Sequence, residues 1–104
     1  MNKQMMNANE LRNALKAAAD YFAQTGNFEW ESEARESLNK MENNDLSFVE
    51  DLWLKYAPTC DIDDLLITDY EPEDEPKVNE LNEKLAEIAN STFAALEKVK
   101  SENT

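Results

Sequence analysis

Histidine is absent from the 104 residues of this chain, and glycine and cysteine occur once each. Without histidine the chain lacks the commonest general acid or base and the commonest ligand for transition metals. A single glycine cannot build a glycine-rich phosphate loop. Cys60 has no second cysteine to pair with, which indicates a reducing compartment, the cytoplasm. We therefore expect a cytoplasmic protein that is not an enzyme and that holds neither a cofactor nor a metal.

Turn residues and long apolar runs are also scarce. With three prolines and one glycine, the chain has little of the turn chemistry that repeated β-hairpins need. Sandwiches and barrels are therefore disfavoured, and an all-α fold is predicted. No basic and apolar leader opens the sequence, and no apolar run approaches the roughly 18 to 20 residues that span a bilayer. We expect no association with a membrane.

Apolar residues near the start of the chain recur at steps of four, three and four, which is the spacing of one face of a helix. They are Leu11, Leu15, Ala18 and Phe22. Asn7 or Asn9 can cap the start of this helix, and Gly26 stands where a left-handed C-cap residue is expected. Asn27 follows as the N-cap of a second helix, so the pattern predicts an N-terminal helical hairpin.

Two further helices are predicted in the middle of the chain. The second helix of the hairpin is indicated by the spacing of Trp30, Ala34, Leu38 and Met41. Ser47 and Glu50 form a capping-box pattern that opens a third helix, and Pro58 ends it. Its apolar residues are Phe48, Leu52, Trp53 and Tyr56. Asp61 can cap a short segment through residues 65–67, for which we favour a short helix over a single buried strand.

The last part of the chain predicts one long helix from Lys77 to about Lys100. Its apolar residues follow the three and four spacing of a heptad seam. They are Val78, Leu81, Leu85, Ile88, Thr92, Ala95 and Val99. Thr92 and Ala95 weaken the seam, so packing onto the N-terminal helices is favoured over an extended coiled coil. Residues 1–104 are interpreted as a single domain with an acidic linker at about 69–76.

Negative charge is unevenly distributed along the chain. The whole sequence has 23 acidic and 10 basic residues, a net charge of −13. From Asp20 to Glu75 there are 17 acids and 3 bases, a balance of −14, whereas the two ends together have 6 acids and 7 bases, a balance of +1. The whole surplus therefore lies in the middle of the chain. Direct binding of nucleic acid is disfavoured, because phosphate contacts need Lys and Arg.

Eight acidic residues in the second half of this segment form the candidate partner-binding site. They are Asp61, Asp63, Asp64, Asp69, Glu71, Glu73, Asp74 and Glu75. Carboxylates also bind Ca²⁺ and Mg²⁺, but Leu65 and Leu66 occupy the later positions of any EF-hand pattern, and its glycine is missing. We therefore expect no metal site. These residues either dock on a cationic partner or serve as a helix cap and solvated charges.

Two resemblances accompany these patterns. The hairpin around Gly26 and Trp30, followed by Leu52, Trp53 and residues 57–65, resembles small bacterial helical proteins of uncharacterised function, which implies no activity. In size, acidity and helical pattern the chain also resembles the small inhibitors that bacteriophages make against host defence systems, including anti-CRISPR and anti-restriction proteins. That likeness of type implies an inhibitor with a protein target.

The acidic segment predicts a protein that works by binding a partner with a basic surface. Carboxylates along a rigid helical surface can imitate a nucleic-acid backbone and occupy the basic groove of a nuclease or nucleic-acid-binding protein. The alternative is an interaction module with an apolar surface, such as a toxin-neutralising partner or a self-associating helical protein. That surface would include Trp30, Trp53, Tyr56 and Phe93, because Trp and Tyr are enriched at binding hot spots. Homo-oligomerisation is left open.

Overall fold

The computed structural model describes residues 3–57 and 61–102, except for the side chains of residues 3–6, 63 and 64. This part of the chain contains four α-helices, two short 3₁₀ helices and no strand. They are α1 (Lys3–Thr25), α2 (Phe28–Glu42), α3 (Val49–Tyr56), η1 (Asp61–Leu65), η2 (Pro72–Asp74) and α4 (Glu75–Glu102). The predicted all-α fold, with a hairpin, a short third helix and a long last helix, is confirmed.

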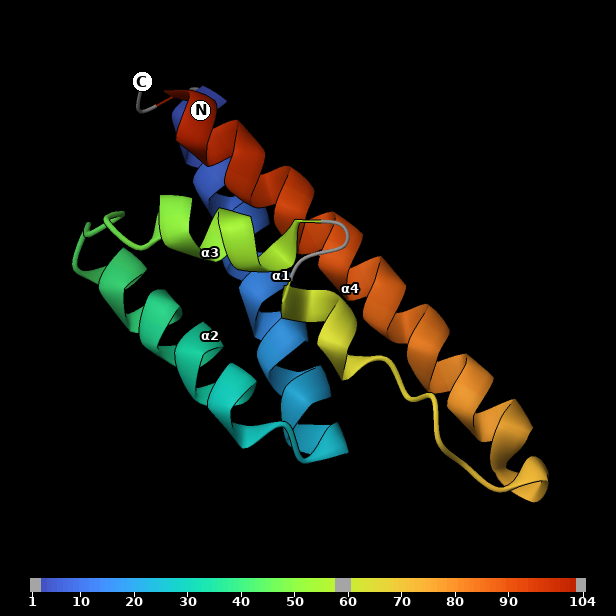
Figure 1. Cartoon of the computed structure of the whole chain (residues 1–104). Coiled ribbons are helices and arrows are strands. Elements are labelled where there is room, and N and C mark those ends of the chain that lie inside the picture. Colours follow the sequence, from blue (N-terminus) through green and yellow to red (C-terminus); the bar gives the residue numbers. More distant parts are fainter. Residues whose placement is uncertain (1–2, 58–60, 103–104) are drawn as a thin grey trace.

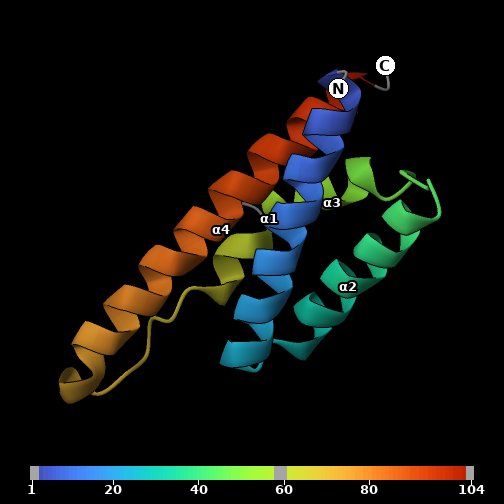
Figure 2. The ribbon, with the colours of Figure 1, turned by 180° about the vertical axis from the view of Figure 1, so that it is seen from behind.

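The first and last helices form the centre of the fold (Figure 1). α1 and α4 run antiparallel side by side, α2 packs on α1, and α3 packs on α4. α3 crosses in front of the α1 and α4 pair in Figure 1 and behind it in Figure 2, which leaves the opposite side of the pair uncovered. The first turns of α1 and the last turns of α4 meet at one end of the pair, where Lys98 and Glu10 form an ion pair at 3.0 Å and Asn7 donates a hydrogen bond to Glu102.

The core lies where α1 meets the other helices. Its fully buried α1 residues include the four that the helical spacing predicted, Leu11, Leu15, Ala18 and Phe22. Aromatic contacts extend this core into α2 and α3, because the Trp30 ring centroid lies 5.6 Å from that of Phe22 and 5.5 Å from that of Tyr56. The Trp53 ring stacks on Phe93 at 5.6 Å. These pairs attach α2 and α3 to the central helix pair, each adding about 0.5 to 1.5 kcal/mol beyond its buried area.

The heptad seam of α4 faces inward as predicted. Six of its seven residues are buried, and Leu81 is half-buried. The buried six are Val78, Leu85, Ile88, Thr92, Ala95 and Val99. α4 has 28 residues, so it is about 42 Å long at 1.5 Å per residue. The seam packs against α1, and the expectation of packing onto an N-terminal helix is confirmed.

Two predicted helix caps are wrong. α1 begins at Lys3, so Asn7 and Asn9 lie inside the helix and do not cap it. The capping box of Ser47 and Glu50 does not form either, because Phe48 is the N-cap of α3 and makes no side-chain cap. The Asp45 carboxylate instead accepts the Ser47 backbone N–H at 2.9 Å. Hydrogen bonding from Ser47, through its side chain first and its backbone N–H second, lowers the pKa of Asp45.

Three other predicted boundaries are confirmed only in part. Asn27 occupies the N-cap of α2, but its side chain donates to the Thr25 hydroxyl at 2.8 Å and makes no cap bond. Asp61 begins a short 3₁₀ helix, as favoured over a strand, but this helix ends at Leu65, so Leu66 and Ile67 lie outside it. The predicted linker at 69–76 is shorter, because η2 and the start of α4 occupy its last residues. Pro58, predicted to end the third helix, and Cys60 lie outside the described residues.

Gly26 closes the hairpin in the left-handed conformation that its position predicted, with φ of +78°. The Asn27 N–H donates to the Phe22 carbonyl at 2.9 Å and the Gly26 N–H to the Ala23 carbonyl at 3.4 Å, which is the pattern of a Schellman cap. A Cβ on Gly26 would meet nothing within 4 Å, so a substitution here tests backbone strain without a clash.

We expect Gly26→Ala to lower the free energy of unfolding by about 1 kcal/mol, because the left-handed conformation disfavours a Cβ. Gly26→Asn should cost less, since Asn tolerates this conformation better than other residues. Urea denaturation of the three proteins measures the difference. Equal stability of the Ala variant and the parent would contradict the left-handed cap.

Candidate acidic docking surface

The acidic connection before α4 projects from the body of the protein. In Figures 1 and 2 the chain between η1 and α4 runs past the end of α1 and turns there into the N-terminal end of α4. The Tyr21 hydroxyl, one turn before α1 ends, donates to the Leu81 carbonyl at 3.0 Å. In both views the start of α4 extends past the end of α1. The molecule is accordingly elongated, with principal extents of 48 × 23 × 21 Å.

We call the acidic residues at this projecting end the acidic tip. They are Asp69, Glu71, Glu73, Asp74 and Glu75, five of the eight predicted site residues. The backbone leading to the tip is fixed by Asn82 of α4. Its side-chain oxygen accepts the Ile67 N–H and its amide donates to the Ile67 carbonyl, both at 3.0 Å. Paired hydrogen bonds of this kind hold the connection against the helix and so set the direction of the tip.

Local sequence shapes the turn at the tip. Pro72 begins η2, where its fixed φ suits the first helical position, and the Asp74 N–H donates to the Glu71 carbonyl at 2.9 Å. Pro76 lies in the first turn of α4, where its missing N–H would have no helical partner. Glu75 lies in the same turn, where negative charge is favoured by the helix dipole. The tip is therefore a helix start with acidic residues around it.

The tip carboxylates are all exposed, and none forms an ion pair with a described residue. The three bases of the acidic segment form ion pairs with acids outside the tip. Arg35 pairs with Glu31 at 2.7 Å, Lys55 with Glu33 at 2.9 Å, and Lys40 with Glu36 at 3.9 Å. All three pairs lie on α2 or between α2 and α3. The charge of the tip is thus left unneutralised, while part of the charge of α2 is compensated.

The remaining three predicted site residues lie apart from the tip. Asp61 is exposed at the start of η1, which packs against α3 in the body of the protein. Asp63 and Asp64 belong to the same short helix, and their side chains lie outside the described ones. The predicted single site of eight carboxylates is therefore divided into a projecting group of five and a group on η1.

The described side chains do not bring three potential metal ligands together anywhere. The tip carboxylates are exposed around a helix start. Exposed charges act on one another weakly in water but present a field that extends about one Debye length, near 8 Å at physiological salt. What this geometry provides is long-range attraction for a cationic surface.

Two exposed apolar side chains next to the tip were not predicted from the sequence. Tyr70 is 40% exposed and Leu66 is 41% exposed, and both belong to the connection that leads into the tip. The signal in the sequence was an aromatic residue placed among acids and prolines, where no helical spacing gives it a position in the core. Apolar contact area therefore accompanies the carboxylates.

The aromatic residues proposed for an apolar surface pack against the core with at least part of their side chains. Tyr56 is buried, and its burial raises the pKa of its phenol. Trp30, Trp53 and Phe93 are half-buried and pack against the core. Lys55 lies 5.0 Å over the Trp30 ring, and Lys100 lies 4.8 Å over the Trp53 ring. These contacts give the aromatic residues structural roles.

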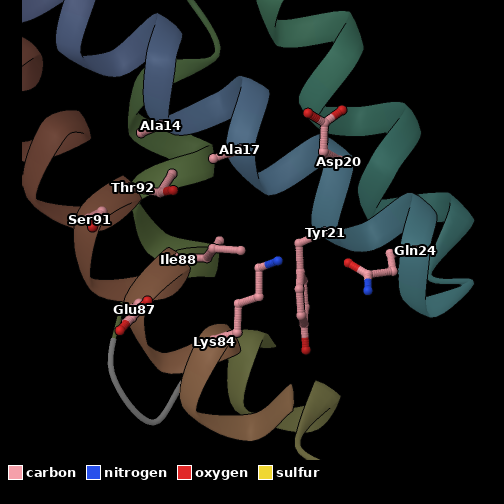
Figure 3. A pocket seen from close by; sticks show the side chains of 10 residues that line it. All are labelled: Ala14, Ala17, Asp20, Tyr21, Gln24, Lys84, Glu87, Ile88, Ser91 and Thr92. Atoms are coloured by element: carbon pink, nitrogen blue, oxygen red, sulfur yellow. The ribbon is translucent and has the colours of Figure 1, made fainter. Parts of the chain in front are cut away.

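A groove between α1 and α4 is the second feature that the sequence did not reveal. It has a volume of about 430 Å³ and lies on the uncovered side of the helix pair (Figure 3). Its lining includes the small residues Ala14, Ala17 and Ser91. Thr92 also lines it, fully buried, with a hydroxyl that finds no hydrogen-bond partner among the described residues. An unsatisfied buried hydroxyl costs about 1 to 3 kcal/mol.

No family model matches the sequence, and neither a curated protein nor a solved structure matches it. Within the described part of the chain, no helix is both long enough and apolar enough to cross a membrane.

Proposed function

We propose that this protein is a non-catalytic inhibitor that docks its acidic tip onto the basic surface of a nuclease or nucleic-acid-binding protein. The proposal rests on the projection of five exposed carboxylates at the N-terminal end of α4. None of them forms an ion pair with a described residue. A partner that holds DNA or RNA presents Lys and Arg in a groove. A narrow, negatively charged projection can enter such a groove in place of the nucleic acid.

The position of the tip matters as much as its charge. Uncompensated carboxylates steer a cationic partner toward them and raise the association rate, provided that they are not neutralised by nearby bases. Arg35, Lys40 and Lys55 pair with acids of α2, and the five tip carboxylates have no ion-pair partner among the described residues. Attachment to a 28-residue helix through Asn82 keeps its orientation fixed, which lowers the entropy lost on docking.

Tyr70 and Leu66 supply the second part of the proposed contact. Electrostatic steering affects mainly the association rate, whereas buried aromatic anchors affect mainly the dissociation rate. Both side chains are exposed, and Tyr70 lies between Asp69 and Glu71 in the sequence. We assign the carboxylates to encounter and Tyr70 to retention of the partner.

The biological setting is part of the same proposal. Small size, acidity and a helical architecture are typical of cytoplasmic phage inhibitors of host defence, such as anti-CRISPR proteins, and this likeness of type supports a nuclease as the target. The alternative of an apolar interaction module is weakened, because Trp30, Trp53, Tyr56 and Phe93 are engaged with the core.

Capture of partners by the immobilised protein tests the proposal. We expect a nuclease or nucleic-acid-binding protein to be retained at low salt, to be released as ionic strength passes about 0.1 M, where the Debye length falls to about 10 Å, and to be displaced by excess DNA or RNA. Inhibition of that partner's activity on nucleic acid should follow the same salt dependence. A partner whose retention is indifferent to salt and to nucleic acid would contradict the docking of the tip.

A further inference from the structure

The uncovered side of the α1 and α4 pair differs in charge from the rest of the molecule. The acidic segment from Asp20 to Glu75 supplies the last six residues of α1 together with α2, α3 and the connection to α4. The two ends of the chain, with a balance of +1, supply most of α1 and α4. The acidic and the near-neutral parts of the chain therefore lie in different parts of the fold. The central helix pair is close to neutral, and the excess of acid lies on the elements around it.

The groove on this uncovered side has two properties of a helix-packing surface. Ala14, Ala17 and Ser91 give a shallow contour that lets another helix approach closely. Thr92 contributes a buried hydroxyl that lacks a partner among the described residues. In Figure 3 the Ile88 and Lys84 side chains extend from α4 into the space between the helices, facing the Tyr21 ring of α1.

Charges of both signs border the groove. They are Asp20 on α1 and Lys84 and Glu87 on α4. Asp20 pairs with Arg35 at 3.6 Å, whereas the exposed Lys84 and Glu87 form no ion pair with a described residue. When two identical surfaces meet around a two-fold axis, each residue can face a different residue of the other copy. Lys84 of one copy can then lie against Glu87 of the second. The groove of one copy is thus complementary in charge to the groove of a second copy.

We propose that a second copy of this chain covers the groove, so that the α1 and α4 pairs of two molecules pack face to face in a two-fold dimer. In this arrangement the near-neutral faces meet, and the acidic elements α2 and α3 stay on the outside, where their mutual repulsion is smallest. A different acidic protein or a nucleic acid would bring like charge toward the molecule, and a strongly cationic partner would favour the tip. The inference does not depend on the inhibitory function.

The available area is sufficient for a reversible dimer. α1 has 23 residues and so extends over about 35 Å, and two adjacent helices are about 20 Å wide. Such a face offers about 700 Å², close to the roughly 800 Å² that each partner buries in stable protein interfaces. Because part of the face is polar, we expect self-association that is reversible and visible at micromolar concentrations.

Sedimentation equilibrium of the wild-type protein tests the dimer directly. We expect the mean mass to rise from monomer toward dimer between about 10 and 500 µM. Salt should strengthen the dimer, because it screens the repulsion between two chains of charge −13. Docking of the tip on a cationic partner is weakened by salt, so the two associations are distinguished by opposite salt dependence. A monomer at every concentration in both low and high salt overturns the inference.

A matched pair of double variants tests the location of the interface. Ala17→Gln with Ser91→Gln adds neutral bulk inside the groove, and we expect it to raise the dimer dissociation constant by about 10-fold or more. Ala23→Gln with Ala86→Gln adds similar bulk at exposed positions of the same two helices outside the groove, and should leave dimerisation unchanged. Circular dichroism verifies that both fold. Equal effects of the two variants, or no effect of the first, would overturn the proposed face.

Discussion

Neutralising the acidic tip is expected to slow association with the cationic partner by about 10- to 100-fold at low salt, because electrostatic steering depends on unpaired surface charge. The variant carries Asp69→Asn, Glu71→Gln, Glu73→Gln and Asp74→Asn. All four side chains are exposed, so the fold should be kept and even slightly stabilised as like charges are removed. Stopped-flow or surface-capture kinetics with the identified partner measures the rate.

A second variant separates the position of the charge from its amount. Glu29→Gln, Glu42→Gln, Glu50→Gln and Asp51→Asn remove the same number of exposed carboxylates from α2 and α3. We expect this control to slow association by only about 2- to 3-fold, through the change in net charge alone. If both variants are slowed equally, total charge and not the tip governs the encounter, and the proposed docking mode is wrong.

Tyr70→Ala in the same assay should act on the other rate. Its expected effect is faster dissociation with nearly unchanged association, since an apolar anchor contributes after encounter. A variant that behaves like the neutralised tip, slowed in association only, would argue against an anchoring role for Tyr70.

Helical periodicity predicted most of the fold, because each helix buries one face and that face leaves a regular pattern in the sequence. Leu11, Leu15, Ala18 and Phe22 were placed in the core by spacing alone, and all are fully buried. Gly26 was equally predictable, because a glycine directly after a helical pattern is typical of a left-handed C-cap. Local signals of this kind depend on residues within a turn or two of one another.

Helix caps were less predictable, because several polar residues can compete for the same backbone groups. Ser47 matched a capping box, but its backbone N–H is taken by Asp45 two residues earlier. Asn7 matched an N-cap, yet its side chain bonds to Glu102 at the other end of the chain. The contact between Asn7 and α4 therefore outweighed the preference of Asn for an N-cap position. The residues around Asn7 in the sequence cannot predict this contact.

The candidate site was predictable in composition but not in shape. The acids between Asp61 and Glu75 lie close together in sequence, and that proximity suggested a single surface. The structure separates them because η1 packs on α3, whereas Asn82 holds Ile67 further along α4. Ile67 and Asn82 are 15 positions apart in the sequence, and no periodic pattern in the sequence predicts that they form hydrogen bonds. The projection of the tip follows from that long-range pair.

Loss of the Phe22 side chain is expected to destabilise the protein more than any single change at the surface. Phe22 is fully buried, and its ring lies 5.7 Å from Tyr21 and 5.6 Å from Trp30, so it joins both helices of the hairpin. Phe22→Ala should lower the free energy of unfolding by about 3 to 5 kcal/mol, from lost burial and the cavity that remains. Domains of this size have only about 5 to 15 kcal/mol in total.

Phe28 provides a matched control from the same hairpin. It begins α2 with 69% of its surface exposed, so Phe28→Ala removes the same atoms without opening a cavity and should change stability by no more than about 0.5 kcal/mol. Urea denaturation followed by circular dichroism gives both values, and an unchanged slope with denaturant verifies that the unfolding transition is the same. Similar losses for the two variants, or a loss below about 1 kcal/mol for Phe22→Ala, would contradict the placement of the core between α1 and α2.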